Sequence, residues 1–353
     1  MRIGILLTHP KSEKKKDELV NIHSRIRPWL KLIADISNKK GLTIRREGKT
    51  MVGGDVSIGL YIMWNYPNVE IDFIRPHQIT SQRLKSNDLN FSVIYDLLES
   101  YHNDSKRIFN RYKRVLERAT NVYPSYQYQK FINNKCNYYK YLEKKKVTVV
   151  PTFCISSSTA HRKGLDTLIT RLLNKIKHQK WKSFIAKPVY GQESLYFKKF
   201  NLNQKRSFRM YMKKALKKFP GIIFQEYVKN FDKENPEVRA YFVGERYEFS
   251  IVTTKKTVKL PKQEGGTAKI PKFTAIKKQA RSVLRKLPPM VIRGKRLPRL
   301  LSRIDIGCCL EGKNKTFVNE LEFVPSLYIE DHKVPIDAYL GDQMIKITKK
   351  FLR

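Results

Sequence analysis

The stretch that decides the expected fold is RIDIGCCLEGKNKTFVNELEFVP, which runs from Arg303 to Pro325. Two apolar segments flank the polar segment EGKNK, whose glycine and asparagine are typical of a tight turn, so the stretch predicts a β-hairpin. Three acids, Asp305, Glu320 and Glu322, lie inside the predicted strands. Acids are scarce in this chain, whose formal net charge is +41, so three acids within two apolar strands indicate a functional site.

Alternation along the strands predicts that the three acids meet. Glu320 and Glu322 share one face of their strand, because successive side chains point to opposite faces. A loop of two or four residues puts Asp305 on the same face. It then lies opposite Glu320 if the loop centres on residues 312–313, or opposite Glu322 if it centres on 313–314. A three-residue loop without a bulge would separate the acids.

Three carboxylates this close repel one another unless a cation lies between them. Their all-oxygen set suits Mg²⁺ or Mn²⁺, and the sequence has no cluster of histidine or cysteine that would favour zinc. We therefore predict a divalent metal site at Asp305, Glu320 and Glu322. The alternative is a solvated acidic face that pairs with nearby lysines.

The bulk composition indicates a protein of several domains. A chain of 353 residues, with 41% hydrophobic and 11% aromatic residues, predicts two or three cores. No apolar run reaches the ~20 residues that span a bilayer. The N-terminal RIGILLTHP reads as a first strand and not as a signal peptide, so we expect an intracellular protein, either cytoplasmic or packaged in a particle. The four cysteines form no CxxC pair, and we expect them to be reduced.

The order of elements predicts an N-terminal α/β domain with a parallel sheet, because strands alternate with helices. The expected strands there are 2–7, 56–64, 69–74 and 91–98, and the expected helix is 14–41. Further helices are expected at 107–119, 128–146, 164–179, 207–220, 273–287 and 341–353. Further strands are expected at 147–156, 183–191 and 222–228, with a hairpin over 237–254 that turns at Gly244.

Two segments indicate a nucleotide site. In FIAKPVYGQES, Lys187 ends an apolar strand and is followed by a loop that contains Gly191, so a point charge and backbone N–H groups could meet phosphates. In FQEYVKNF, an apolar strand runs into a polar segment, and the backbone of Glu226 and Val228 could read the edge of an adenine. A solvated lysine and an ordinary strand end are the alternatives.

The succession of these motifs, from about Asn133 to Leu327, resembles the ATP-grasp superfamily. Its members include ribosomal-protein glutamate ligases, D-alanine–D-alanine ligases, glutathione synthetases and inositol trisphosphate kinases. The resemblance implies an α/β (α+β) ATP-grasp fold in three parts. These are a Rossmann-like N-terminal domain (1–115), a central small α+β domain (116–220) and a C-terminal antiparallel-sheet domain with the metal-binding hairpin (221–353). ATP would lie between the last two.

The resemblance also implies roles for individual residues. ATP phosphates would meet Lys135, Lys187 and the loop at Gly191. The adenine hinge would be Gln225, Glu226, Tyr227 and Val228, and Glu237 would reach the ribose. Arg239 would face the transferred phosphate or the substrate, and Arg303 would stabilise the tetrahedral intermediate. Two magnesium ions would be held by Asp305, Glu320 and Glu322. The family often has asparagine where this chain has Glu322, and the usual substrate-side pattern is not evident.

Three functions remain open at this point. The first is a ligase that joins a carboxylate to an amine through an acylphosphate. The second is a kinase for a polyanionic small molecule such as an inositol phosphate. It is favoured by the stretch from Lys255 to Arg303, which has sixteen Lys or Arg and one acid and forms either a solvated helix face or an electropositive wall. The third is a non-catalytic polyanion-binding or packaged protein. Expected partners are an anionic small molecule or an acidic peptide, with non-specific attraction to nucleic acid.

Overall fold

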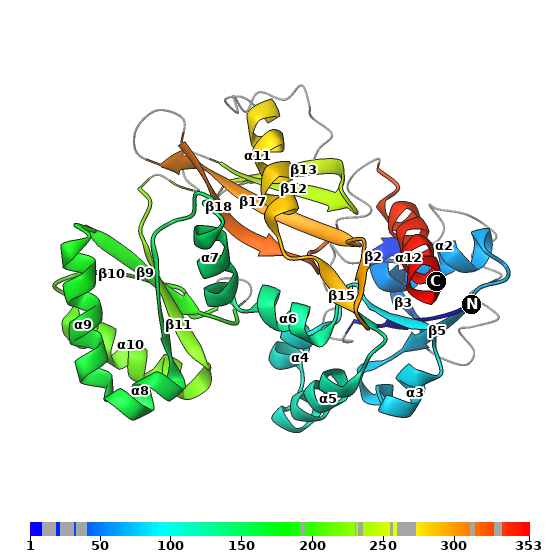
Figure 1. The fold of residues 1–353 in the computed structure, drawn as a ribbon, viewed down its shortest axis with the longest axis horizontal. Helices are drawn as coiled ribbons and strands as arrows, with labels where there is room; N and C mark the ends of the chain where they lie inside the picture. The colour runs from blue at the N-terminus through cyan, green and yellow to red at the C-terminus, as the bar shows by residue number, and fades with distance from the viewer. Residues whose placement is uncertain are drawn as a thin grey trace.

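The computed structural model describes residues 1–8, 19–21, 32, 41–191, 195–229, 231, 236–254, 257–259, 273–310, 315–327 and 334–353 (Figure 1). These residues form a mixed α/β fold that contains one parallel sheet and several antiparallel ones. The predicted fold class is therefore confirmed. Within the described residues, every helix is too short or too polar to cross a bilayer.

The N-terminal part contains the predicted parallel sheet, in the order β5-β1-β6-β7. Its strands are β1 (Arg2–Leu6), β5 (Glu70–Ile74), β6 (Leu89–Ser92) and β7 (Val122–Tyr123). A small antiparallel sheet contains β2 (Leu19–Asn21), β4 (Lys49–Gly53) and β3 (Thr43–Arg46). The helical segments here are α2 (Gly54–Asn65), η4 (Pro76–Gln78), α3 (Ser81–Lys85), α4 (Leu97–Asn103) and α5 (Lys106–Arg118).

The strand predicted over 56–64 is wrong, because these residues lie in the helix α2. Eight of the twelve residues of α2 are buried, on the sides that face the sheet and that face the C-terminal helix. A helix covered on several sides has no polar face, so its sequence reads like a buried strand. The absence of a side chain at Gly59 lets α2 approach β5 closely, because a Cβ there would lie 2.4 Å from the ring of Phe73.

Two other predicted elements also need correction. Leu19 and Val20, expected within a helix over 14–41, are buried in strand β2 and pair with β4. Asn21 also belongs to β2, and the rest of that predicted helix lies outside the described residues, except for Leu32, which is helical, and Gly41. The strand predicted over 91–98 ends at Ser92. The residues from Leu97 on form the helix α4, whose N-terminus is capped by the Asp96 side chain, which accepts hydrogen bonds from two backbone N–H groups.

The helix predicted over 128–146 is two helices, α6 (Tyr126–Asn133) and α7 (Lys135–Lys144). Asn134 separates them, since its side-chain oxygen accepts hydrogen bonds from the N–H groups of Cys136 (3.1 Å) and Asn137 (3.3 Å). The cap makes Lys135 the first residue of α7. The backbone N–H of Lys135 also donates to the carbonyl of Val189, next to the strand that carries Lys187.

The central antiparallel sheet has the order β10-β9-β11-β8. Its strands are β8 (Thr152–Ser156), β9 (Ser183–Pro188), β10 (Lys198–Asn201) and β11 (Gly221–Glu226), so the sheet runs across residue 220. One face is covered by α8 (Ser157–Lys163), α9 (Leu165–His178) and α10 (Lys205–Lys218) (Figure 1). Phe184 and Ala186 face that core, whereas Ile185 and Lys187 point the other way. The domain boundaries at 115 and 220 stay predictions.

The C-terminal antiparallel sheet has the order β14-β13-β12-β17-β18. The predicted hairpin is confirmed as β12 (Glu237–Val243) and β13 (Arg246–Thr254), with Gly244 at a φ of +63°. The other elements are β14 (Thr257–Lys259), α11 (Phe273–Lys286), the hairpin of β15 (Met290–Ile292) and β16 (Lys295–Leu297), β17 (Leu301–Leu310), β18 (Lys315–Glu322) and α12 (Ile336–Leu352). Residues 255–256 and 260–272, which belong to the basic stretch, lie outside the described residues.

The C-terminal helix α12 packs against α2, near the opposite end of the chain (Figure 1). Ser57 donates a hydrogen bond of 2.7 Å to Asp337, and both groups are buried. A Cβ at Gly341 would lie 2.5 Å from the ring of Tyr61, so the absent side chain lets the two helices approach closely. The two ends of the chain therefore share one core.

The expectation that the cysteines are reduced is wrong for one pair. Cys136 in α7 and Cys154 in β8 form a disulfide that closes a loop with a sequence separation of 18 residues. Spacing within the sequence gave no sign of this pair, because the two residues meet only when α7 packs on the central sheet. The bond ties the helix of Lys135 to that sheet.

We predict that Cys136→Ser lowers the free energy of unfolding by about 3 kcal/mol, the loss of chain constraint expected for a loop of this length. Urea unfolding followed by circular dichroism measures it. Cys308→Ser is the matched control, since Cys308 lies outside the disulfide, and should change stability by less than about 1 kcal/mol. Alkylation of both Cys136 and Cys154 in the unreduced folded protein would contradict the bond.

Candidate active site

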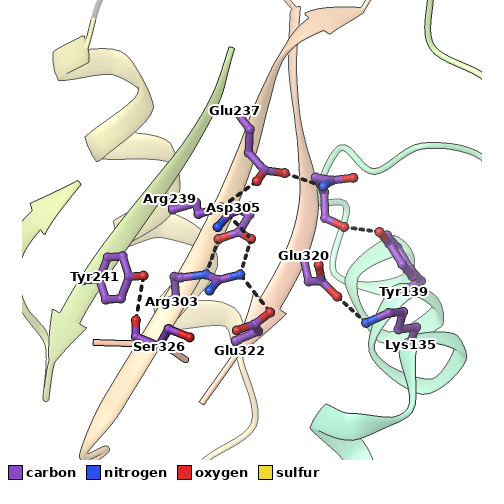
Figure 2. A network of polar contacts seen from close by, with 11 residues as sticks. Lys135, Tyr139, Glu237, Arg239, Tyr241, Arg303, Asp305, Glu320, Glu322 and Ser326 are labelled. Carbon is purple, nitrogen blue, oxygen red and sulfur yellow. Dashed lines mark hydrogen bonds and ion pairs between the residues drawn. The ribbon is translucent and has the colours of Figure 1, made fainter. Parts of the chain in front are cut away.

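The site is built on three adjacent strands, β12, β17 and β18, whose registers align their polar residues in rows. Arg239 lies opposite Asp305, which lies opposite Glu320. In the next row, Arg303 lies opposite Glu322. Side chains from both rows project from the same face and meet there (Figure 2). The apolar face of the same strands, with Ala240 and Ile304, is buried in the core.

The hairpin therefore brings the three predicted acids together. One carboxylate oxygen from each of Asp305, Glu320 and Glu322 lies within 4.8 Å of the others. Asp305 is opposite Glu320, as expected for a loop centred on 312–313, although residues 311–314 lie outside the described residues. The register shifts between Asp305 and Ile306, so a bulge at Asn319 interrupts the regular alternation just beyond the acids.

Basic side chains pair with these acids (Figure 2). Arg303 donates two hydrogen bonds of 2.8 Å to Asp305, and its Nη2 lies 2.8 Å from Glu322. Arg239 donates to Glu237 over 2.8 Å and lies 3.9 Å from Asp305.

A further pair joins α7 to the C-terminal sheet. Lys135, at the start of α7, donates to Glu320. Asp305 is the most deeply placed of the acids, with 1% of its side chain exposed, whereas Glu320 is 23% and Glu322 33% exposed. Two of the three acids are thus open to a ligand.

The electrostatics reflect this crowding. Burial raises the pKa of Asp305 to about 6 although Arg303 opposes the shift. Burial also raises the pKa of Glu322 to about 7, and the charges of Glu320 and Asp305 add to that effect. Burial alone would raise the pKa of Glu320 too, but Lys135 and Lys187 together lower it to about 2. Burial lowers the pKa of Lys187 to about 8, and the nearby Lys135 contributes.

A cleft of about 770 Å³ opens between this face and the central sheet. Twelve residues that the sequence singled out line it: Lys135, Lys187, Gly191, Gln225, Glu226, Tyr227, Val228, Glu237, Arg239, Arg303, Glu320 and Glu322. Asp305 lies beneath the lining and contacts Arg303. The structure thus brings every predicted site residue to one place, and their chemical roles stay predictions.

The strand end predicted to read adenine has a backbone suited to that purpose. The N–H groups of Glu226 and Tyr227 donate to the carbonyls of Pro151 (3.3 Å) and Ser183 (3.0 Å). The N–H of Val228 donates no hydrogen bond to any described residue, so this donor is open to a ligand. The Gln225 side chain, in contrast, turns to Thr152 over 2.9 Å. Apolar walls come from Val150, Ile185 and Phe317.

Sequence reasoning missed three residues that shape the site. Tyr139, one helical turn after Lys135, donates to the carbonyl of Asn319. The Asn319 side chain donates to Glu237, so α7 and the bulge both support the acids (Figure 2). Phe317 lies over Gly307, where a Cβ would be 2.3 Å from its ring. The spacing of Lys135 and Tyr139 by four residues was the only available signal.

The basic stretch from Lys255 to Arg303 does not form a wall of this cleft within the part of the chain that the structure describes. Arg303 alone among its described residues lines the cleft. The ammonium group of Lys277, in α11, lies 3.8 Å from the ring centre of Tyr247. Four others, Arg285, Lys286, Arg296 and Arg299, line a different cavity.

Comparisons with known proteins were made by sequence and by structure. No protein-family model matches the sequence, and no characterised protein is a significant sequence match. Solved structures do match. D-cycloserine synthetase DcsG superposes with a TM-score of 0.61 at 12% identity, covering 99% of this chain and 100% of that chain. D-alanyl-alanine synthetase A from Vibrio cholerae gives 0.60 at 13% identity, covering 99% and 98%.

A third match is the ATP-grasp ligase PsnB, in a structure with minimal precursor, Mg and ADP. It superposes with a TM-score of 0.50 at 14% identity and covers 84% of this chain and 95% of that chain. At such identities, the three comparisons establish a shared fold and leave the reaction open.

We predict that Arg303→Met destabilises the protein by about 3–5 kcal/mol, because it leaves Asp305 and Glu322 in the site without their buried partner. Adding Asp305→Asn should recover part of that loss in a double-mutant cycle measured by urea unfolding. Arg209→Met is the matched control: it breaks an equally short pair with Asp166, but both side chains are exposed, and the change should be below about 1 kcal/mol. Equal losses for the two arginines would contradict this description.

Proposed function

Because the chain has the ATP-grasp fold, we propose that it is an ATP- and magnesium-dependent ligase that joins a carboxylate to an amine through an acylphosphate. The observation that carries the proposal is a cluster of three carboxylates within 4.8 Å of one another, two in the wall of the cleft and one just beneath it, accompanied by four basic side chains. Recognition of a phosphate chain with bound metal requires both kinds of charge.

The formal charges of the site support a nucleotide with metal ions. Four acids, Glu237, Asp305, Glu320 and Glu322, stand against four bases, Lys135, Lys187, Arg239 and Arg303. The site is therefore neutral when all eight groups are charged. ATP with two Mg²⁺ ions is also close to neutral, so it can enter without leaving an excess charge buried in the cleft.

The donor set fits magnesium. Asp305, Glu320 and Glu322 offer hard oxygen atoms, and no histidine or cysteine lies among this group of described residues. When bound, the ions would neutralise phosphate oxygens during phosphoryl transfer. Lys135 contacts Glu320 in the structure, and we propose that it turns to a phosphate when a nucleotide binds. Lys187 holds a second positive charge on the facing sheet.

The remaining roles follow from where each group lies. Adenine would stack between the apolar walls while its edge meets the backbone at Glu226 and Val228. Glu237 would reach the ribose, and the loop at Gly191 would cover the phosphates. The volume of about 770 Å³ is within the range of small-molecule sites.

The proposed reaction has two steps. A substrate carboxylate oxygen attacks the γ-phosphorus of ATP, and ADP leaves. The amine nitrogen then attacks the acyl carbon, the bond from that carbon to the phosphate oxygen breaks, and phosphate leaves as the nitrogen loses a proton. Arg303 uses Nε and Nη2 for Asp305 and Glu322, which leaves Nη1 to donate to the oxyanion. Arg239 adds positive charge beside it.

The geometry does not favour the kinase alternative. A polyphosphorylated acceptor needs several cations around it, and the described part of the basic stretch supplies only Arg303 to the cleft. The products distinguish all three functions. A ligase yields ADP, phosphate and an amide in equal amounts, a kinase yields ADP and a phosphorylated product, and a non-catalytic protein yields none of them.

We predict magnesium-dependent formation of ADP and phosphate when the protein is screened with ATP against pairs of carboxylates and amines. Asp305→Asn and Glu320→Gln should each lower that rate about 100-fold or more, because each removes charge stabilisation worth ~3 kcal/mol. Asp166→Asn, an exposed acid in α9, is the matched control and should leave the rate unchanged. A phosphorylated product without free phosphate, or equal rates in all variants, would contradict the proposal.

A further inference from the structure

A second cavity, of about 1120 Å³, lies at the other end of β12 from Glu237. Its walls come from the C-terminal ends of α7 and α11, the turn between β12 and β13, the β15–β16 hairpin and α12. It has no lining residue in common with the cleft. A ligand in this cavity would therefore contact none of the residues that line the cleft.

The lining of this cavity is strongly basic. Eight cationic residues contribute to it: Lys145, Arg246, Arg285, Lys286, Arg296, Arg299, Lys346 and Lys350. Two acids, Glu245 and Asp342, accompany them. A hollow with a formal charge of +6 attracts and concentrates anions.

Most of these positive charges have no acidic partner within the described structure. Asp342 accepts hydrogen bonds from the hydroxyls of Tyr61 (2.9 Å) and Tyr66 (2.7 Å). Arg246 is the one cation of the eight that pairs with an acid among the described residues, over 2.6 Å to Glu248. Arg299 donates to backbone carbonyls. Six cations therefore have no acidic partner in the part of the chain that the structure describes: Lys145, Arg285, Lys286, Arg296, Lys346 and Lys350.

Helix ends account for some of this charge. Arg285 and Lys286 lie in the last turn of α11, and Lys350 lies in the last turn of α12, where cations offset the helix dipole. That effect does not apply to Arg296 in a hairpin or to Lys346 within α12. The helix dipole also does not explain why the six cations without an acidic partner, which come from the end of α7, from α11, from β16 and from α12, line the same cavity.

The floor of the cavity is apolar. Val243, Leu287, Met290 and Leu297 line it and are each less than 8% exposed, and Tyr141 and Tyr339 also belong to the lining of the cavity. Inorganic polyphosphate has no apolar surface to place there. A duplex nucleic acid presents a charged sugar-phosphate backbone and likewise offers no large apolar side chain for this floor. A peptide with acidic residues around a large apolar side chain matches both parts of the lining. Its apolar side chain suits the floor, and its carboxylates suit the eight cations, which are here called the basic rim.

We propose that this cavity is a docking site for an acidic peptide segment that inserts an apolar or aromatic side chain between its carboxylates. The carboxylates pair with the basic rim, and the apolar side chain covers the floor. The segment would belong to a partner protein, and the cleft would stay accessible while it is bound.

The experiment measures fluorescence anisotropy of a labelled glutamate-rich peptide with a central Leu–Phe pair. Lys346→Glu with Lys350→Glu should weaken its binding about tenfold or more, equivalent to about 1.4 kcal/mol. The matched control is Lys213→Glu with Lys217→Glu, which makes the same charge change, with the same spacing, on exposed positions of α10. That control should retain the wild-type affinity.

Two further measurements complete the test. A peptide with Ser–Ser in place of Leu–Phe should bind more weakly, and Glu320→Gln, in the cleft, should not change the affinity. The proposal is overturned if both double variants lose affinity equally, because binding then follows net charge alone. It is also overturned if the Ser–Ser peptide binds as tightly, or if duplex DNA or triphosphate binds the cavity more tightly than the peptide.

Discussion

The hydrogen-bonded pair of Arg303 and Asp305 is the interaction on which the site depends. A carboxylate that is 1% exposed is stable as an anion only beside a cation, and Arg303 supplies it from the same strand. Because Arg303 also contacts Glu322, one guanidinium fixes acids on two strands and so favours a single register of the hairpin. A shift of β18 by one residue would turn Glu320 and Glu322 toward the apolar core.

Several features of the fold follow from that constraint. Gly307 has no side chain, and this leaves room for the ring of Phe317 to lie over β17, two residues beyond Asp305. The bulge at Asn319 directs an amide to Glu237 and a carbonyl to Tyr139. Through Tyr139 and Lys135, helix α7 meets the acidic hairpin, and its disulfide ties it to the central sheet. The cleft is thus bounded by elements that are far apart in the sequence.

The sequence predicted the hairpin and the acids that face one another on it, because strand alternation and a short loop are local signals. It failed where the deciding contacts are distant. Helix α2 reads as a strand because it is buried on several sides, and β2 depends on pairing with β4. The disulfide and the contact of Lys135 with Glu320 join elements that meet only in the folded chain. The second cavity gathers cations from elements spread over about half of the sequence, so the sequence showed their number but not their convergence.

The central claim is that the paired charges in the cleft are a binding site for a nucleotide with divalent metal. Isothermal titration calorimetry with a non-hydrolysable ATP analogue tests it most directly. The account predicts saturable binding in magnesium, much weaker binding in EDTA, and loss of the magnesium dependence when Glu320 and Glu322 are both changed to glutamine. Absence of heat at millimolar analogue, or equal binding with and without magnesium, would contradict it.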